Sequence, residues 1–539
     1  MESKKAREWL KNAIFYEIYP QSFCDSNADG IGDIQGIISK LDYIESIGCN
    51  AIWLNPLFDS PFVDAGYDIR DYYRVASRYG TNADLKSLFD ESHKRGMHVL
   101  LDLVPGHTSI ECEWFKQSQK DEKNEFTDRY IWTSNVWEGF EGVGNIMGFI
   151  RGGTEREGCC AANFYNAQPA LNFGFYRVEK PWQQGVDSAG AIATREAIKD
   201  VMRFWLSLGA DGFRVDMAHS LIKNDEDSKG AIALWQNFAA FLDEEFPSAV
   251  MVSEWGEADK SLAAGFQMDF VLHFGPSHYL ELFRKENESH VEHSKIKPYF
   301  SRSGGGDAKA FFDVYMKNHA LTAGKGGLIC IPSGNHDMIR MARTLDAEEM
   351  KIAFAFILTM PGVPFIYYGD EIGMKYVEGL RSVEGGYVRT GSRSPMAFDR
   401  TANAGFSAAP ASALYIAQDE SKREINAETE SADESSLLSE VRRLIAFRKA
   451  HSALGATAEI ELLELEENSY PLVYKRQSAD ETIFALFNPS GEEVTVKAAL
   501  PENAEVVYTV GKSAIALKRG EGGSLVLNAS CAVFLKAKN

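Results

Sequence analysis

Between residue 13 and about residue 375, eight short apolar segments alternate with stretches of helical spacing. Each segment is nearly continuous in apolar residues, many of them β-branched or aromatic, which is typical of a strand buried on both faces. Eight such strands separated by helices predict an α/β fold, a (β/α)8 TIM barrel, with its active site where the C-terminal ends of the strands meet the following loops. The predicted strands are residues 13–20, 51–56, 98–105, 211–216, 249–255, 268–274, 327–334 and 364–371.

Apolar residues at helical spacing, followed by a glycine, indicate two of the intervening helices, which end before Gly48 and Gly209. Their apolar faces are formed by Leu41, Ile44 and Ile47 and by Ile198, Val201, Phe204, Trp205 and Leu208.

Two intervals interrupt this alternation and define further domains. Residues 107–175 are too long for a connecting loop and are predicted to form an excursion domain after the third strand, so that the barrel itself comprises residues 1–106 and 176–454. Residues 455–539 change to alternating strand patterns with turn residues, which predicts a C-terminal antiparallel β-sandwich domain. The polar, acidic stretch 418–435 is predicted to be a surface loop or linker.

Charge and cysteine content exclude several classes of partner and location. A formal net charge of −21 disfavours nucleic acid and anionic membranes but not a neutral ligand such as a sugar. The 7 cysteines show no framework spacing and fit a reducing compartment. No apolar run is long enough for a membrane span, and the N-terminus has no signal-peptide pattern, so we expect a cytoplasmic protein without membrane contact.

Charged side chains gather at the ends of the predicted strands, and in a barrel these ends converge on one mouth. Arg214 and Asp216 are two residues apart on one strand and therefore point to the same side. A cation beside crowded carboxylates holds one of them ionised, and a pair of carboxylates in different protonation states is the chemistry of glycoside hydrolysis. For any single strand-end aspartate, a helix cap or loop anchor is the alternative. The strand-end set is Asp102, His107, Arg214, Asp216, Glu254, His336 and Asp337.

Six sequence motifs follow one another along the predicted barrel: GYDI (66–69), DLVPGHTS (102–109), QPALNF (168–173), GFRVDMAHS (212–220), VSEWGE (252–257) and GNHDMIR (334–340). Through these motifs the chain resembles the α-amylase family of retaining α-glycoside hydrolases and transglycosylases, from about residue 13 to the end. A finer resemblance, through YEIYPQSFCDSNADGIGDIQGI and RSPMAFDRTANAGF, is to the α-glucosidase and oligo-1,6-glucosidase group.

The resemblance implies roles for the strand-end residues. Asp216 would be the nucleophile that forms a β-glucosyl-enzyme, Glu254 the general acid/base, and Asp337 a third acid that binds sugar hydroxyls. Arg214 would orient Asp216, and Asp102 would support the site from behind.

The resemblance also implies how the sugar is held. His107 and His336 would donate to hydroxyls of the sugar at the cleavage point, and Tyr67 would stack beneath it. Asp68 and Arg393 would pair to close the pocket around a non-reducing glucose, which favours exo attack on short oligosaccharides. The alternative for Arg393 is a salt bridge that only anchors its loop.

The segment DSNADGIGD offers oxygen ligands at alternating positions. The resemblance places a structural Ca²⁺ or Mg²⁺ here, and it implies no organic cofactor; the alternative is a series of Asx turns without metal. The ligands would be Asp25, Asn27, Asp29, Ile31 through its carbonyl, and Asp33.

Departures from the family pattern refine these expectations. Gly106 and Ser220 stand where α-amylases carry two ligands of a different calcium ion, so we expect that second site to be absent. Met217, next to the nucleophile, matches neither the α-1,4 nor the α-1,6 pattern of glucosidases and leaves the linkage open.

The sequence therefore predicts an exo-acting α-glucosidase that releases glucose from short α-glucans, with a small oligosaccharide as its partner, as a monomer or homodimer. Alternatives are a transglycosylase or isomerase of the same family, trehalose synthase-like or sucrose-acting, and an endo-acting α-amylase. A non-catalytic scaffold of this fold would lack the three carboxylates and is disfavoured.

Overall fold

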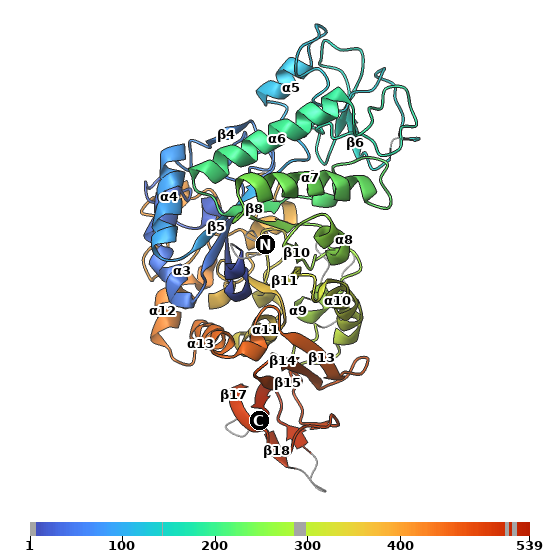
Figure 1. Cartoon of the computed structure of the whole chain (residues 1–539). Helices are drawn as coiled ribbons and strands as arrows, with labels where there is room; N and C mark the ends of the chain where they lie inside the picture. The colour runs from blue at the N-terminus through green and yellow to red at the C-terminus, as the bar shows by residue number, and fades with distance from the viewer. Residues whose placement is uncertain (1–6, 143, 285–297, 512–516, 520–524, 539) are drawn as a thin grey trace.

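The computed structural model of the chain describes residues 7–142, 144–284, 298–511, 517–519 and 525–538. Eight parallel strands close into a barrel in the order β1-β12-β11-β10-β9-β8-β5-β2 (Figure 1). The predicted TIM barrel is confirmed, and each predicted strand overlaps one barrel strand. These are β1 (Phe15–Ile18), β2 (Ala51–Leu54), β5 (His98–Leu103), β8 (Gly212–Val215), β9 (Val250–Ser253), β10 (Met268–Phe270), β11 (Leu328–Pro332) and β12 (Val363–Tyr367).

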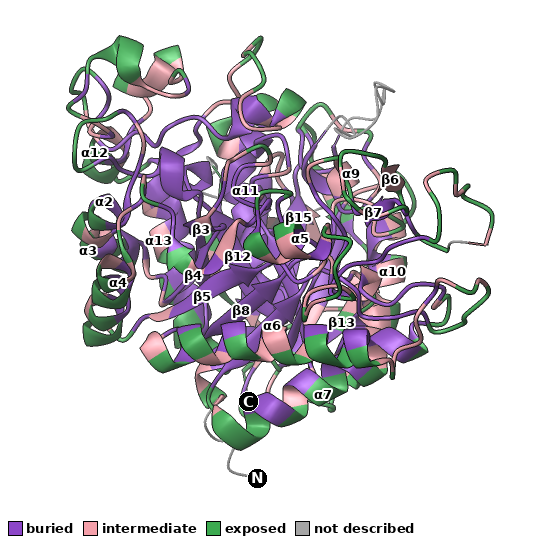
Figure 2. Ribbon diagram, turned by 90° about the horizontal axis from the view of Figure 1, so that it is seen from above, coloured by how far each residue is buried: buried purple, intermediate pink, exposed green. Residues whose placement is uncertain are grey.

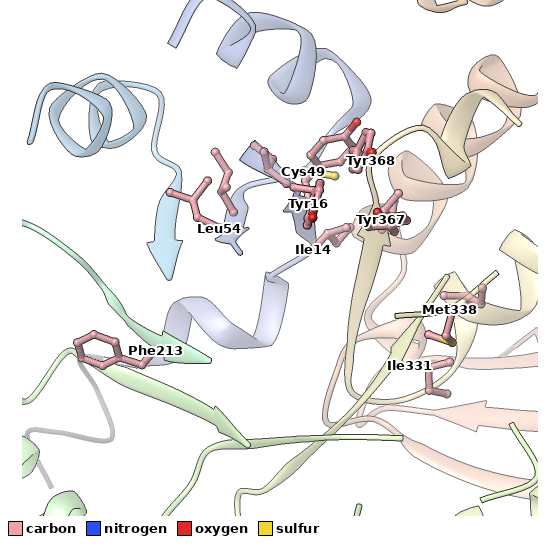
Figure 3. Close-up of a cluster of buried hydrophobic side chains, with 14 of the residues drawn as sticks. Ile14, Tyr16, Cys49, Leu54, Phe213, Ile331, Met338, Tyr367 and Tyr368 are labelled. Atoms are coloured by element: carbon pink, nitrogen blue, oxygen red, sulfur yellow. The ribbon is translucent and has the colours of Figure 1, made fainter. Parts of the chain in front are cut away.

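Successive residues of each strand point alternately into the barrel and out towards the helices. Phe15 and Trp53 belong to the interior cluster, whereas Tyr16 and Phe213 belong to the layer between strands and helices. Figure 3 shows part of this outer layer, with Tyr16 close to Tyr367 and Tyr368. The alternation decides which polar residues reach the interior: a charged residue two positions after an inward apolar one also points inward.

Helices surround the barrel and turn one buried face towards the strands (Figure 2). The predicted glycine stops are confirmed, because α3 ends at Gly48 with φ 104° and α6 at Gly209 with φ 128°. Phe204, expected on the apolar face of α6, is 36 % exposed instead. In the part of the chain that the structure describes, no helix is both long and apolar enough to span a bilayer. The helices are α2 (Ile34–Ser39), α3 (Leu41–Ile47), α4 (Asn82–Lys94), α6 (Ala189–Leu208), α7 (Lys229–Glu245), α8 (Ala258–Ala263), α9 (Leu280–Phe283), α10 (Ala308–Thr322), α11 (Ala347–Thr359) and α13 (Leu437–Ala450).

The chain between β5 and α6 leaves the barrel at its C-terminal end and forms the excursion seen at the top of Figure 1. It contains α5 (Glu113–Ser118) and a two-stranded antiparallel sheet of β6 (Gly148–Ile150) and β7 (Cys160–Ala162). A bridge between His107 and Ala170 ties its last segment to the loop after β5. A second small sheet, β3 (Phe58–Asp59) with β4 (Asp71–Val75), lies in the preceding connection.

The C-terminal domain consists of two antiparallel sheets, as predicted. One face of the larger sheet packs on the smaller sheet through a cluster that includes Phe484 and Val533. The other face packs on the barrel helices, where the ring of Phe487 lies 6.1 Å from that of Phe356 on α11. The larger sheet contains β13 (Glu459–Glu464), β14 (Leu472–Gln477), β15 (Thr482–Asn488), β20 (Cys531–Lys536) and β17 (Glu505–Val510); the smaller contains β16 (Val494–Val496), β19 (Leu525–Leu527) and β18 (Leu517–Arg519).

Two buried arginines reinforce this junction. Arg448 donates to the carbonyls of Leu358, Met360 and Gly362, at the C-terminal end of α11, and Arg476 on β14 donates to the carbonyl of Thr359. These carbonyls have no partner within the helix, and the negative end of the helix dipole favours a cation there. A residue of the barrel domain and a residue of the C-terminal domain therefore cap the same helix.

The stretch 418–435 is not a plain loop, and that prediction was wrong. It contains a short 3-10 helix, η8 (Glu420–Arg423), and the helix α12 (Ala427–Ala432). Asn426 is fully buried; it accepts from Thr429 N and donates to the carbonyls of Lys422 and Arg423. Side-chain capping, which leaves no apolar periodicity in the sequence, organises this segment.

Candidate active site

One arginine joins three carboxylates at the mouth of the barrel. The Arg214 side chain, from β8, is 4 % exposed. Its Nη1 lies 2.8 Å from Asp102 Oδ1 and 3.0 Å from Asp216 Oδ1, and its Nη2 lies 2.7 Å from Glu254 Oε2. The predicted same-side placement of Arg214 and Asp216 is thus confirmed, and Glu254, from the end of β9, shares the same guanidinium.

The charges of this group favour one proton among the carboxyls. Burial raises the pKa of Asp216 well above its usual range, and Arg214 opposes that rise. Burial likewise raises the pKa of Asp102 to about 6, against the same arginine. Because one guanidinium cannot balance three carboxylates in a site with little water, the arrangement provides both an ionised and a protonated carboxyl, as an acid and a nucleophile require.

The residue after the nucleophile position has a strained backbone. Met217 has φ 40°, in the left-handed region that a long side chain seldom adopts. This conformation turns its N–H towards Glu254, where it donates to Oε2 over 3.0 Å. The strain therefore fixes the position of Glu254 relative to the end of β8.

Asp337, in the loop after β11, is held by cations on one side. Its Oδ1 accepts from Arg389 Nη1 at 2.5 Å and Arg393 Nη2 at 3.1 Å, and its Oδ2 lies 3.4 Å from His336 Nε2. Burial alone would raise its pKa, but the nearby Nε2–H of His336 and the charges of Arg389 and Arg393 outweigh burial and hold the pKa well below its usual range. Asp337 is therefore an ionised acceptor, suited to sugar hydroxyls.

Tyr67 and His336 link the two parts of the site. The Tyr67 hydroxyl donates to Asp102 Oδ2 over 2.9 Å and lies 2.8 Å from His336 Nε2, and the two rings are nearly parallel with centroids 5.3 Å apart. Both side chains thus lie among the carboxylates, where the sequence placed them; stacking of Tyr67 on a sugar stays a prediction.

His107 is buried beside Tyr67, but both of its ring nitrogens have partners. Nε2 lies 3.0 Å from the carbonyl of Tyr67, and Nδ1 lies 3.0 Å from Asn163 Nδ2. Burial lowers its pKa to about 4, so the ring is neutral. To donate to a sugar hydroxyl, as predicted, His107 must release the Tyr67 carbonyl.

The predicted pair of Asp68 and Arg393 is not formed, and that prediction is corrected. The Asp68 carboxylate accepts from Ser60 Oγ and from the backbone N–H groups of Val63 and Asp64, which occupies both of its oxygens within its own loop. Arg393 is directed instead to Asp337 and the carbonyl of His336.

The segment 25–33 is organised by its own hydrogen bonds. Asp25 accepts from the amides of residues 27, 28 and 30, Asn27 from that of Asp29, and Asp29 from that of Ile31, which is a series of Asx turns. Asp33 caps α2 through Gly36 N and binds Ser26. Over the described ranges, no three His, Cys, Asp or Glu side chains are grouped closely enough to hold a metal ion, and the oxygens of Asp25, Asn27 and Asp29 accept from backbone amides instead. The Ca²⁺ or Mg²⁺ ion stays a prediction.

A buried lysine contacts Ser220, one of the two positions whose residues led us to expect that the second calcium site is absent. Lys223 is 3 % exposed, and its ammonium donates to the carbonyl of Ser220 over 2.8 Å. Burial lowers its pKa to about 8, and its charge helps to lower the pKa of His107. A fixed positive charge from the chain itself is compatible with the absence of a cation at this position.

Four contacts of the site were missed by the sequence interpretation. Asn55 and Glu17 contact His336 Nδ1, Trp53 donates to Asp102, and Arg389 contacts Asp337. Asn55 follows β2, so the search for polar residues at strand ends could have found it. Arg389 lies in the 3-10 helix η6 (Tyr387–Ser392), and no pattern in the sequence indicates its direction.

Comparison with known proteins agrees with this geometry. Residues 17–457 match the family profile described as "Alpha amylase, catalytic domain". The chain is 31% identical over 519 residues to the trehalose synthase/amylase TreS of Mycobacterium tuberculosis (87% of this chain, 80% of that protein), and 30% identical over 539 residues to an oligo-1,6-glucosidase of Bacillus sp. (88% and 99%). The crystal structure of the trehalulose synthase MutB from Pseudomonas mesoacidophila superposes with a TM-score of 0.80 at 25% identity, covering 98% of this chain and 99% of that one.

Proposed function

Because the chain belongs to the α-amylase family of glycoside hydrolases and transglycosylases, we propose that it is a retaining, exo-acting α-glucosidase that releases glucose from short α-glucans. The observation that carries the proposal is the single guanidinium of Arg214 shared by Asp216 and Glu254, at the ends of neighbouring strands. Two carboxyls bound to one guanidinium are close neighbours, and closely spaced carboxyls are typical of a retaining enzyme.

In the first step the Asp216 carboxylate attacks the anomeric carbon. The bond from that carbon to the glycosidic oxygen breaks, and the Glu254 carboxyl delivers its proton to the departing oxygen. The products are a β-glucosyl ester on Asp216 and a free aglycone. Arg214 stabilises the ionised nucleophile before attack and the Glu254 carboxylate after it has lost its proton.

In the second step Glu254 acts as a base. It takes a proton from a water molecule, whose oxygen attacks the anomeric carbon, and the ester bond to Asp216 breaks with release of α-glucose. Asp337, held ionised by Arg389 and Arg393, accepts hydrogen bonds from sugar hydroxyls as positive charge develops on the ring.

Exo action is supported by the loop that precedes Arg393. Glu384 in this loop pairs with Arg78 at 2.5 Å, and Arg389 reaches from it to Asp337. The loop is thereby anchored to Arg78 and to Asp337, which favours a closed pocket for one terminal glucose over an open groove for a polymer.

The test is the release of glucose from maltose, isomaltose, sucrose, trehalose and soluble starch by wild type, Glu254→Gln and Glu257→Gln. We expect Glu254→Gln to lose about 10²–10⁴-fold in kcat. Glu257, exposed and paired with Lys260, is the matched control and should keep full activity. Near-wild-type turnover by Glu254→Gln would refute the mechanism, and a fall in starch viscosity before glucose appears would indicate endo action.

Transglycosylation is the second candidate, and the similarity to trehalose synthase and trehalulose synthase favours it. Hydrolysis and transfer share one glucosyl-enzyme and differ in whether water or a sugar hydroxyl attacks it. Analysis of the products from maltose and from sucrose separates the two: glucose alone, or trehalose, isomeric disaccharides and longer sugars.

We further propose a cytoplasmic location and a monomeric or homodimeric state. Six of the 7 cysteines are buried and form no disulfide, including the adjacent Cys159 and Cys160, which supports a reducing compartment. These six are Cys24, Cys49, Cys112, Cys159, Cys160 and Cys330. Sedimentation of the purified protein tests the oligomeric state.

A further inference from the structure

A buried carboxyl with no assigned role lies inside the barrel. Glu17, on β1, has no exposed surface, and its Oε2 has no hydrogen-bond partner among the described residues. Its Oε1 lies 3.0 Å from His336 Nδ1 and accepts from the His336 backbone N–H at 3.3 Å. An ionised carboxylate with one bare oxygen is costly in such a place, so its proton must be considered together with that of His336.

The contacts of Tyr67 determine which nitrogen of His336 carries a proton. The Tyr67 hydroxyl has one hydrogen, which it donates to Asp102. The nitrogen that faces the same hydroxyl at 2.8 Å, His336 Nε2, must therefore be a donor. In a neutral ring with Nε2–H, the lone pair lies on Nδ1, which needs a donor.

Two groups face that lone pair, Asn55 Nδ2 and Glu17 Oε1, each at 3.0 Å. A carboxylate against a lone pair would repel it, whereas one proton between Glu17 and Nδ1 makes the contact attractive. We propose that Glu17 is a positioning residue that shares one proton with His336 Nδ1 and thereby keeps Nε2 a permanent hydrogen-bond donor to the Tyr67 hydroxyl at the sugar site. This inference rests on the proposed function of the same site.

The surrounding charges are compatible with a neutral pair. Burial raises the pKa of Glu17 well above its usual range and lowers that of His336 well below, so both groups favour their uncharged forms. Among the described residues, the charged and titratable groups that face the pair are Tyr19, Tyr67, Asp102, Arg214, Asp337, Tyr367, Arg389 and Arg393.

Loss of the shared proton at high pH would have a defined consequence. Nδ1 would then take the ring proton to satisfy the Glu17 carboxylate, and Nε2 would become an acceptor. Tyr67 would have to donate to Nε2 instead of Asp102, which breaks the chain of hydrogen bonds that runs through Asp102 to Arg214. Activity should therefore decline at alkaline pH for a reason separate from Glu254.

The experiment measures kcat/KM against pH with α-glucosyl fluoride, whose leaving group departs without a proton, so that the acid role of Glu254 adds no alkaline decline. Wild type should show such a decline. Glu17→Gln, whose amide donates to Nδ1 at every pH, should stay within about tenfold of wild type near neutral pH and lack the decline, whereas Glu17→Leu should lose about 10- to 100-fold in kcat. The matched control is Glu371→Gln, a second fully buried glutamate that binds Tyr16 and Tyr43 outside the site, and it should keep the wild-type profile.

A second readout does not depend on turnover. Nitrogen-15 NMR of histidine-labelled protein, with the His336 signal identified by its absence in His336→Gln, should show an Nε2–H ring in wild type and Glu17→Gln and a changed tautomer balance in Glu17→Leu. An Nδ1–H ring in wild type, or an alkaline decline that persists in Glu17→Gln, would overturn the inference. If wild type cleaves no glucoside, the proposed function fails, while the NMR result still decides the pairing.

Discussion

Replacement of Arg214 by methionine should change the pH at which the enzyme works, not only its rate. Arg214 Nη1 lies 3.0 Å from Asp216 Oδ1, and opposite charges about 4 Å apart attract by about 4 kcal/mol at an effective dielectric constant of about 20. At 1.36 kcal/mol per pKa unit, loss of this attraction raises the pKa of Asp216 by about 3 units, beyond the rise that burial already causes. At a pH below the pKa of Asp216 in both wild type and Arg214→Met, the ionised fraction of Asp216 should then fall by about 10³-fold, and kcat/KM should fall with it.

The assay is kcat/KM for 4-nitrophenyl α-glucoside from pH 4 to pH 9, in which the acid decline of Arg214→Met should lie about 3 units above that of wild type. Arg214→Lys is the control: it keeps a cation but cannot reach Asp102, Asp216 and Glu254 together, so it should lose rate with a smaller shift. Since loss of one partner from a buried ion pair costs about 3–5 kcal/mol, circular dichroism must first confirm that each variant is folded. A folded Arg214→Met with an equal loss of rate at every pH would refute the electrostatic reasoning and leave only a geometric role.

Three further predictions follow from local contacts. Arg389→Met should lower kcat by about tenfold because, of the two arginines that contact Asp337 in the described part of the chain, Arg393 then remains, whereas Arg381→Met, in the same loop, should have no effect on steady-state rates. His93 is hydrogen-bonded to Asp211 at 2.8 Å, and this bond raises its pKa, so its stabilising charge is present at low pH and is lost as pH rises. Thermal melts should show stability falling by less than about 1 kcal/mol as pH rises above about 6.5, with no such fall in Asp211→Asn. Calcium should raise the Tm of chelator-treated protein, and Asp29→Ala should abolish that rise; an unchanged Tm would favour the Asx-turn interpretation of the segment 25–33.

The barrel could be predicted because its strands are buried on both faces. A strand that is buried on both faces is a continuous apolar run, so even one as short as AIWL can be recognised in the sequence. Eight such runs separated by helices are compatible with few folds other than a barrel. The predicted strands were longer than the observed ones, for example 249–255 against Val250–Ser253, because the residues that leave the ladder to line the site are also partly apolar. Trp255, after Glu254, is a buried apolar residue beyond the end of β9.

The catalytic cluster could be predicted for a geometric reason. Arg214 and Asp216 share a face because side chains alternate along any strand, whatever the tertiary structure. The partner of Arg393 could not be predicted, because two carboxylates compete for it. Asp68 already accepts hydrogen bonds from three donors of its own loop, so Arg393 binds Asp337 instead. Such competition is decided by loop conformation, which leaves no periodic signal.

The two arginines at the end of α11 couple the C-terminal sheet to the barrel that carries the active site. Since Arg448 and Arg476 cap one helix from two domains, a chain cut after residue 454 would keep only the first cap and would expose the apolar surface that Phe487 covers. Chimaeras that exchange this domain between relatives must therefore transfer the β14 arginine and its carbonyl partners together. Heating should unfold the barrel and the C-terminal sheet in one cooperative transition. A substitution that stabilises the sheet should therefore also raise the temperature at which the active site is lost.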